Sequence, residues 1–291
     1  MSPPLRGHLA MLAFSALVAG SFSLGALAAP LISAEALTLA RFALAAALVG
    51  GAALGLGIQP RAFVAPWRYL ILGALLAFYF VLMFIGLQTA AAVPTAAVFT
   101  LTPIMAAGFG WLLLGQITTS RMWVALVLGG AGALWVIFRG DLTAMIRLDI
   151  GRGEVVYFIG CAAHALYTPM VRKLNRGESA VTFTFGTLLA GFLWLLFWGG
   201  PAAIHTNWAA LPPIVWICLA YIAVAASALT FVLIQYATLR LPSAKVMAYT
   251  YLVPSWVILW ELAMRHPAPP AAVIPGVALT AVALFLLLKE E

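Results

Sequence analysis

The sequence predicts an all-α polytopic membrane protein whose ten transmembrane helices form two inverted five-helix repeats. Three observations lead to this fold class. Of the 291 residues, 65% are hydrophobic and only 8% are charged, whereas a soluble domain carries about 25% charged residues. The mean hydropathy is +1.10, and the apolar residues fall in runs of about 20, the length of a bilayer-spanning helix. Part of the first half of the chain also reappears in the second half.

Glycine, proline and charged residues separate the apolar runs and set the helix boundaries. The first run has a second interpretation, because Arg6 precedes it and Ala26-Leu27-Ala28 lies near its end, as in a signal peptide. The run from Leu9 to Leu31 is long for a signal peptide, so we expect a retained helix. The ten helices are expected at residues 8–29, 33–56, 66–87, 91–114, 120–138, 153–173, 179–199, 212–238, 243–264 and 270–288.

The longest separator divides the chain into a first repeat at residues 1–138, a connector at 139–152 and a second repeat at 153–291. Apolar residues alternate with charges in the connector, a pattern typical of a short amphipathic helix in the membrane interface. A plain linker between two halves is the alternative, and the sequence favours neither.

The repeat is visible in an ungapped alignment of residues 80–103 with residues 231–254. Within it, Phe80-Val81-Leu82 matches Phe231-Val232-Leu233. Since each repeat holds five helices, an odd number, the second copy enters the membrane from the opposite side. Inverted repeats are characteristic of secondary carriers, which bind their substrate near the midplane between the copies.

Lysine and arginine are unevenly distributed over the predicted loops. With the N-terminus inside, ten lie in cytoplasmic segments and four in outside segments, which predicts cytoplasmic N- and C-termini. The exception is the connector, which holds three of the four outside arginines. The net charge of +7 therefore reflects membrane topology, and we expect no nucleic-acid partner.

Pro103 and Pro254 lie about midway along the helices at 91–114 and 243–264. A proline inside a helix kinks it and frees a backbone carbonyl, and such a carbonyl can line a cavity and accept a substrate amine. A fixed bend that serves packing alone is the alternative. We predict that both prolines are hinges.

Deep aromatic and polar side chains are the candidate substrate-binding residues. Rings would hold the apolar part of an amphipathic ligand, and hydroxyl, amide or imidazole groups would hold its polar part. Each side chain also has a plainer interpretation, as a packing residue or as a polar group bonded to its own helix. The candidates are Tyr79, Thr95, Phe99, His164, Tyr167, Gln235, Tyr249 and Trp256.

Two charged residues are candidates for ion coupling or for binding a substrate carboxylate. Arg41 lies about eight residues into the second helix, where a charge is costly. It binds a carboxylate, pairs with an acid or snorkels to the outer surface. Glu261 lies near the outer end of the ninth helix and is either a proton site or a solvated end residue. His164 is a further candidate for proton coupling.

Small residues recur every fourth position in the fifth and tenth helices, which lets helix backbones approach closely. We expect this face to hold helices together within the chain, with a dimer interface as the alternative. The chain is therefore predicted to be a monomer or a homodimer. The residues are Ala125, Gly129 and Ala133 in one helix, and Ala272, Gly276 and Thr280 in the other.

Several functional classes lack their sequence signals. There is no G-x-x-x-x-G-K-[ST] motif for ATP binding, no metal-ligand spacing of His and Cys, and no clustered catalytic set. We therefore expect no enzyme, no catalytic residue, no metal and no cofactor. A channel usually needs repeated polar rings, whereas an inverted repeat favours a carrier. The expected partners are the lipid bilayer and a small-molecule substrate.

The chain resembles the EamA branch of the drug/metabolite transporter superfamily, and within it most closely the YddG-type amino acid exporters. The resemblance covers nearly the whole chain. It rests on the ten helices in two repeats, on Arg41-Phe42 in the second helix, and on Pro103 and Pro254. Family members often carry a glutamate thirteen residues after the first of these prolines, where this chain has Gln116.

This resemblance implies export of amino acids, often aromatic ones, through the bacterial inner membrane by alternating access. It also implies a central cavity between the two halves, which we expect the first, third, fourth, sixth, eighth and ninth helices to line. A drug or quaternary-cation extruder, or a carrier of nucleotides or sugars, is the alternative within the same superfamily.

Overall fold

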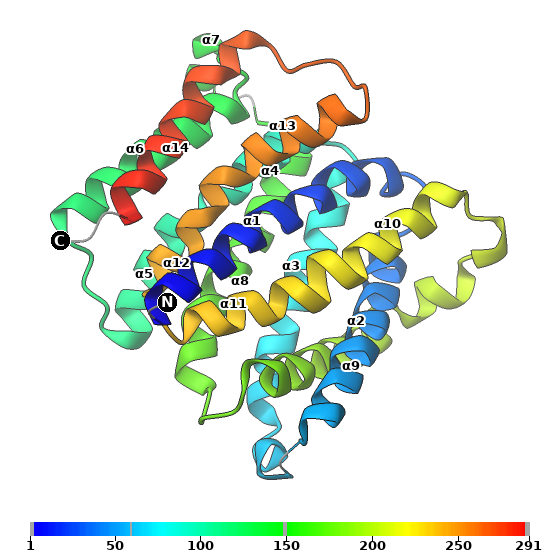
Figure 1. The fold of residues 1–291 in the computed structure, drawn as a ribbon. Coiled ribbons are helices and arrows are strands. Elements are labelled where there is room, and N and C mark those ends of the chain that lie inside the picture. Colours follow the sequence, from blue (N-terminus) through cyan, green and yellow to red (C-terminus); the bar gives the residue numbers. More distant parts are fainter. Residues whose placement is uncertain (1–2, 59, 148–149, 289–291) are drawn as a thin grey trace.

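The computed structural model describes residues 3–58, 60–147 and 150–288, and this part of the chain is built from helices and the turns between them (Figure 1). In chain order the elements are α1 (Pro3–Ala28), α2 (Ala34–Leu56), η1 (Pro60–Phe63), α3 (Trp67–Leu87), α4 (Ala92–Phe99), α5 (Thr102–Leu114), α6 (Ser120–Ile137), α7 (Leu142–Arg147), α8 (Arg152–Leu174), α9 (Ala180–His205), η2 (Trp208–Ala210), α10 (Pro213–Ala223), η3 (Val224–Leu229), α11 (Thr230–Thr238), α12 (Ser243–Ala248), η4 (Tyr249–Leu252), α13 (Val253–Ala263), η5 (Ala271–Val273) and α14 (Ile274–Leu288).

Nine helices within the described residues are long and apolar enough to cross a membrane, and they coincide with nine of the ten predicted spans. Several contain breaks, so that α4 and α5 form one span, as do α10 to α11 and α12 to α13. The remaining predicted span is α8. Its uncharged stretch covers only residues 155–171, at the short end of what crosses a bilayer. A tenth span at α8 therefore stays a prediction.

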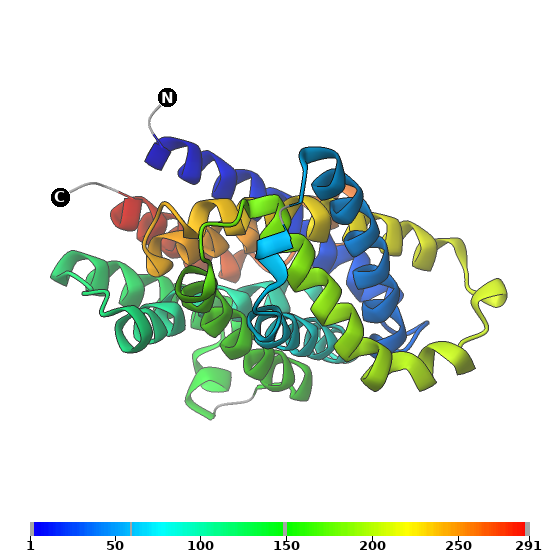
Figure 2. The same ribbon diagram turned by 90° about the horizontal axis from the view of Figure 1, so that it is seen from below.

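The two repeats are interleaved and do not form separate halves. The most extensive contacts between them join α2 to α9, α6 to α14 and α3 to α8. The α6–α14 pair forms one edge of the molecule and the α2–α9 pair the opposite edge (Figures 1 and 2). In the middle, α1 packs on α10 and α11 as α3 packs on α8. A two-fold relation between five-helix repeats explains these contacts. The first helix of each repeat then packs on the third helix of the other repeat.

Two helices are interrupted at the predicted proline positions. The first break, at Thr100 and Leu101, separates α4 from α5, and Pro103 lies in the first turn of α5. The second is the 3₁₀ turn η4, and Pro254 lies in the first turn of α13. Proline has no N–H for the carbonyl four residues earlier. At the first break the Thr102 hydroxyl fills that role, donating to the Phe99 carbonyl at 2.7 Å.

The connector contains a short helix, α7, none of whose residues is buried. Asp141 accepts hydrogen bonds from the N–H groups of Thr143 and Ala144 at its start. Ile146 is 80% exposed. A helix with exposed apolar residues fits the interfacial interpretation better than the plain linker.

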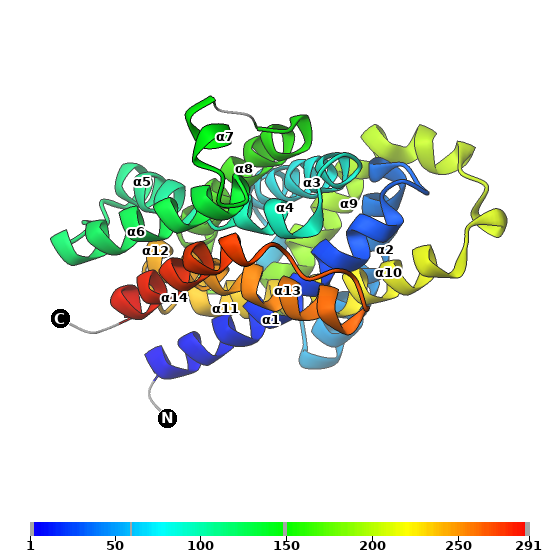
Figure 3. The ribbon, with the colours of Figure 1, turned by 90° about the horizontal axis from the view of Figure 1, so that it is seen from above.

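The start of α1 and the end of α14 lie at the same end of the helix bundle, and α7 lies at the opposite end (Figures 1 and 3). That both belong to one side of the membrane stays a prediction. Which side is cytoplasmic remains the prediction made from the distribution of lysine and arginine.

Candidate functional site

A cluster of aromatic rings fills the contact between the two repeats. Tyr79 of α3 lies 4.4 Å from His164 of α8, measured between ring centroids, and Phe99 of α4 lies 5.3 Å from His164. Tyr167, one turn along α8, stacks on His164 at 6.1 Å. All four residues are buried. Four of the eight predicted substrate-binding residues thus lie side by side.

Polar groups extend this cluster on both sides. Gln235 of α11 donates from Nε2 to the hydroxyl of Tyr167 at 2.9 Å. Tyr157 of α8 shares a hydrogen bond of 2.9 Å with Tyr79, hydroxyl to hydroxyl. Tyr157 was not among the predicted residues. Tyr157 lies seven residues before His164 in α8, about two helical turns. This spacing puts both side chains on one face of the helix and could have identified Tyr157 from the sequence.

Two polar atoms of the cluster are buried without a hydrogen-bond partner, His164 Nδ1 and Gln235 Oε1. A buried polar group left unpaired costs about 1–3 kcal/mol, and buried polar groups in proteins nearly always have a partner. The cluster therefore offers an imidazole nitrogen and an amide oxygen to the polar groups of a ligand.

Arg41 of α2 lies fully buried at the same contact between the repeats. Its Nε donates to Ser227 Oγ at 2.5 Å and its Nη2 to the Ala226 carbonyl at 2.5 Å. Its Cζ lies 3.6 Å from the centre of the Phe80 ring, within the range of a cation–π interaction. The third nitrogen, Nη1, is buried and has no partner.

Two of the three interpretations of Arg41 do not fit the structure. The residue does not snorkel, since none of its surface is exposed. It forms no ion pair with an acid among the described residues. Binding an anionic group of the substrate stays a prediction.

The acceptors of Arg41 belong to η3, a π-helical segment inside the span formed by α10 and α11. Ser227 donates its own hydroxyl proton to the Ile222 carbonyl at 2.7 Å, so its oxygen lone pairs are available to Arg41. Single π-helical turns frequently occur at functional sites. No sequence pattern had predicted η3 or its contact with Arg41.

Phe80 connects Arg41 to the ring cluster. Its ring centroid lies 4.4 Å from that of Tyr79 and 5.5 Å from that of Phe231. Phe80 and Phe231 are equivalent positions of the two repeats, so their stacked rings meet across the symmetry relation. The guanidinium, the phenylalanine pair and the Tyr79–His164 cluster form one continuous buried group.

The other predicted substrate-binding residues lie elsewhere or are engaged locally. The Thr95 hydroxyl donates to the Ala91 carbonyl of its own helix at 2.8 Å. Tyr249 and Trp256 face α1: the Tyr249 hydroxyl lies 3.1 Å from His8 Nδ1, and Trp256 Nε1 donates to Ser15 Oγ at 3.2 Å. At the helix breaks, the hydroxyls of Thr102 and Thr250 lie 3.3 Å apart across the repeats.

A family model described as "EamA-like transporter family" matches this chain twice, at residues 5–138 and 151–289. The chain belongs to the EamA-like transporter family. It is 25% identical over 214 residues to the "Uncharacterized transporter YyaM" of Bacillus subtilis (strain 168), covering 72% of this chain and 69% of that protein. A solved crystal structure with 18% identity shares its fold at a TM-score of 0.74, covering 99% of this chain and 97% of that one. The protein is thus a multi-pass membrane transporter.

In this EamA-like transporter, Gln116 contacts the second repeat. Its side-chain Oε1 accepts a hydrogen bond of 3.1 Å from the N–H of Ser243, the first residue of α12. No side chain of α12's own segment caps that end, and the first N–H groups of a helix need acceptors from outside it. Gln116 therefore caps the N-terminus of α12.

Glu261 lies at the end of α13, where its Oε2 is 2.8 Å from His266 Nδ1. It lines a peripheral cavity of about 340 Å³ together with Arg139 and Pro267. The structure therefore places Glu261 apart from the buried group around Arg41.

Proposed function

We propose that this EamA-like transporter is a secondary carrier that exports small amphipathic carboxylates, amino acids foremost, across the bacterial inner membrane by alternating access. One observation carries the proposal. Arg41 is buried between the repeats, has an unpartnered N–H and forms no ion pair among the described residues.

A buried guanidinium favours an anionic ligand. A charge at the centre of a bilayer costs about 2.5–3.5 kcal/mol on insertion scales, and Phe80 and two neutral oxygens compensate it only in part. A substrate carboxylate would supply the missing negative charge and an acceptor for Nη1. Arginine binds carboxylates with strong, charge-assisted hydrogen bonds.

The rest of an amino acid has complementary groups nearby. Gln235 Oε1 and His164 Nδ1 lack partners and would accept hydrogen bonds from an ammonium group. The rings of Tyr79, Phe99 and Tyr167 would surround an apolar side chain. These rings are closely packed, so substrate entry requires the repeats to move apart.

Breaks in the spans support such a movement. The helix breaks beside Pro103 and Pro254 occupy equivalent positions of the two repeats, and we propose both prolines as its hinges. We also propose α8 as the tenth span. With nine spans, the start of α1 and the end of α14 would lie on opposite sides of the membrane, whereas a tenth span would agree with their position at the same end of the helix bundle (Figure 1).

Cation extrusion is the weaker alternative. A cation site inside a membrane usually has a deep acid as partner, and the acid that the sequence singles out, Glu261, lies at a helix end beside His266. A carrier of nucleotides or sugar phosphates would also use a buried cation, to bind the phosphate. The efflux test below distinguishes such a carrier from an amino-acid exporter.

The test is efflux from liposomes that contain the purified protein and a labelled amino-acid mixture, with and without a pH gradient. We expect selective release of some amino acids. We expect Arg41→Gln, which keeps a hydrogen-bond donor but removes the charge, to lose at least about tenfold in rate, the equivalent of one hydrogen bond to a charged group.

The matched control is Arg147→Gln, an exposed arginine of α7. It should transport at the wild-type rate. No release of any amino acid by folded, inserted protein would refute the proposed substrate class, and phosphorylated substrates would be assayed next. Equal rates for Arg41→Gln and wild type would remove Arg41 from the site.

A further inference from the structure

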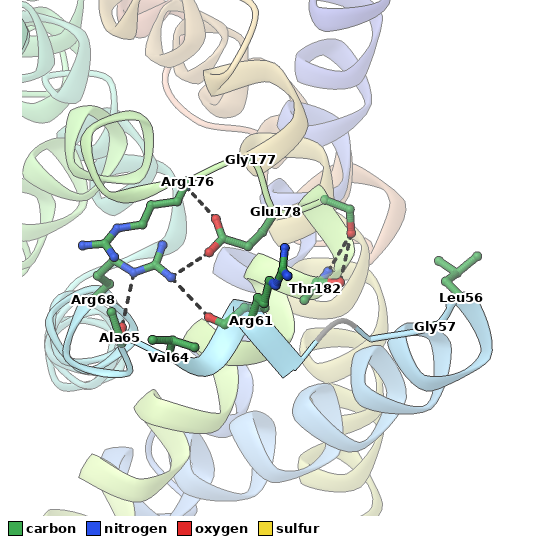
Figure 4. Close-up of a pocket in the computed structure, with 12 residues that line it drawn as sticks. Leu56, Gly57, Arg61, Val64, Ala65, Arg68, Arg176, Gly177, Glu178 and Thr182 are labelled. Atoms are coloured by element: carbon green, nitrogen blue, oxygen red, sulfur yellow. Dashed lines mark hydrogen bonds and ion pairs between the residues drawn. The ribbon is translucent and has the colours of Figure 1, made fainter.

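A concave site lies at one end of the bundle, away from the buried group around Arg41. Its volume is about 610 Å³. The end of α2, the turn η1, the start of α3 and the loop between α8 and α9 surround it (Figure 4). Its lining combines Arg61, Arg68 and Arg176 with a single acid, Glu178.

Arg68 and Glu178 neutralise each other inside this site. Arg68 Nη2 donates to Glu178 Oε1 at 2.6 Å, and both side chains are buried, at 2% and 8% exposure. The other oxygen of Glu178 accepts from the N–H of Arg176 at 2.6 Å. Arg68 donates in addition to the carbonyls of Ala62, Ala65 and Leu174. This pair is therefore occupied by structural contacts.

Arg61 and Arg176 are left as excess positive charge. Both are exposed, and in the described part of the chain neither forms an ion pair. The Arg61 side chain reaches from η1 toward the segment that carries Glu178 and Thr182 (Figure 4). Because both oxygens of Glu178 are engaged, the site offers two positive charges and no free carboxylate. It suits an anion better than a zwitterion, whose ammonium group would find no acid.

The site also has an apolar rim where two of the spans end. Leu56 and Val64, which line it, are 74% and 77% exposed. The site lies where two spans end, and the half-exposed Trp67 at the start of α3 is the kind of residue that marks the membrane interface. A soluble anion would leave this apolar rim uncovered, whereas acyl chains would cover it.

We propose that this site binds the phosphate headgroup of an anionic phospholipid, with Arg61 and Arg176 on the phosphate and Leu56 and Val64 against the acyl chains. Basic pockets between transmembrane helices bind anionic headgroups on the cytoplasmic side, and the distribution of lysine and arginine predicts that this end is cytoplasmic. A bound lipid would hold the α2–α3 turn against the loop between α8 and α9, and so join the two repeats at this edge.

The test counts lipids retained by the full-length protein. Wild type, the double variant Arg61→Gln/Arg176→Gln and the control Arg147→Gln/Arg152→Gln are placed in nanodiscs of equal phosphatidylcholine and phosphatidylglycerol, then released for native mass spectrometry. We expect wild type and control to retain phosphatidylglycerol preferentially. The site variant should lose about tenfold or more of that preference, since each arginine near a membrane surface contributes about 1 kcal/mol.

Two further arms separate the alternatives. Arg61→Lys/Arg176→Lys keeps the charge and should keep the preference, which distinguishes loss of charge from misfolding. Inorganic phosphate in millimolar excess should not displace the lipid. The proposal is overturned if phosphate displaces it, which would assign the site to a free anion, if the site variant retains lipid as wild type does, or if phosphatidylcholine is retained equally.

Discussion

Arg41 in the first repeat and Ser227 in the second are joined by a hydrogen bond of 2.5 Å from Nε to Oγ, 186 residues apart in the chain. The bond fixes the guanidinium between the repeats while Nη1 stays unpartnered. Ser227 is thus a positioning residue for Arg41.

We expect Ser227→Ala to raise the apparent KM for amino-acid efflux by about tenfold or more, the equivalent of one hydrogen bond to a charged group, with little change in the maximal rate. Efflux at several substrate loads measures both quantities. Ser227→Thr keeps the hydroxyl and should restore the wild-type KM. If the two substitutions behave alike, Ser227 does not act through this hydrogen bond.

Tyr79 calls for two substitutions, because its side chain is both buried and hydrogen-bonded. Tyr79→Ala would leave a cavity among Phe80, Phe99 and His164 and should destabilise the protein by about 3–5 kcal/mol, so loss of transport would say little about binding. Tyr79→Phe removes only the bond to Tyr157. We expect it to cost about 1 kcal/mol of stability and to change the selectivity between aromatic and aliphatic amino acids.

Thermal unfolding in detergent and efflux of a mixed amino-acid load measure the two effects. Unchanged selectivity in a stable Tyr79→Phe variant would make this tyrosine a packing residue. The same pair of measurements on Tyr249→Phe is the comparison, since the Tyr249 hydroxyl lies beside His8 on α1.

The sequence predicted the elements of the fold better than the contacts of the site. Apolar runs and prolines are local signals, so the nine spans found in the described residues and the breaks beside Pro103 and Pro254 agree with expectation. Helix faces are not local signals here, because apolar residues occupy nearly every face. For that reason the sequence could not show that Tyr249 and Trp256 contact α1 while Tyr79 contacts α8. The η3 turn and the partners of Arg41 depend on packing between distant segments, which no spacing encodes.

The ion pair between Arg68 and Glu178 should make stability depend on pH. Partial burial acts to raise the pKa of Glu178, but hydrogen bonds from Arg68 and from the Arg176 N–H outweigh it and hold the pKa below its ordinary value of 4.5. A carboxyl whose folded-state pKa is depressed stabilises the protein above its unfolded-state pKa. The contribution is lost as the pH falls through 4.5 toward the folded-state value.

We therefore expect Glu178→Gln to lower the free energy of unfolding by about 1.5–3 kcal/mol at neutral pH, and by progressively less below pH 4.5. Melting temperatures of wild type and variant in one detergent over this range provide the measurement. A constant difference down to the lowest pH would mean that the carboxylate charge contributes nothing.

Gln116 Oε1 caps the N-terminus of α12 by accepting a hydrogen bond from the Ser243 N–H. Substitutions of Gln116 should therefore change the stability of the protein in a definite order. Gln116→Leu removes the acceptor and should cost about 1 kcal/mol. Gln116→Glu keeps an acceptor and places a negative charge at a helix N-terminus, which is favourable. We expect melting temperatures in the order Glu, Gln, Leu, and a leucine variant as stable as wild type would contradict the cap.

Gly132 of α6 and Gly276 of α14 mark a point of close approach between these helices. A Cβ on Gly276 would lie 2.7 Å from the Gly132 carbonyl oxygen, and a Cβ on Gly132 would lie 2.6 Å from the Gly276 oxygen. Of the predicted small residues, Gly276 thus serves the helix contact as expected. Gly129 makes room for the Tyr251 ring instead. Backbone atoms cannot yield as a flexible side chain does, so an added methyl group must push the helices apart.

We expect Gly276→Ala to destabilise the protein by about 1–3 kcal/mol, the usual cost of overpacking. Gly51→Ala in α2 is the matched control, because no atom lies within 4 Å of the position its Cβ would take. It should be neutral or stabilise by about 0.5–1 kcal/mol, since alanine favours a helix over glycine. Thermal unfolding in one detergent compares the two, and equal shifts would show that the α6–α14 contact tolerates a wider separation than the backbone geometry implies.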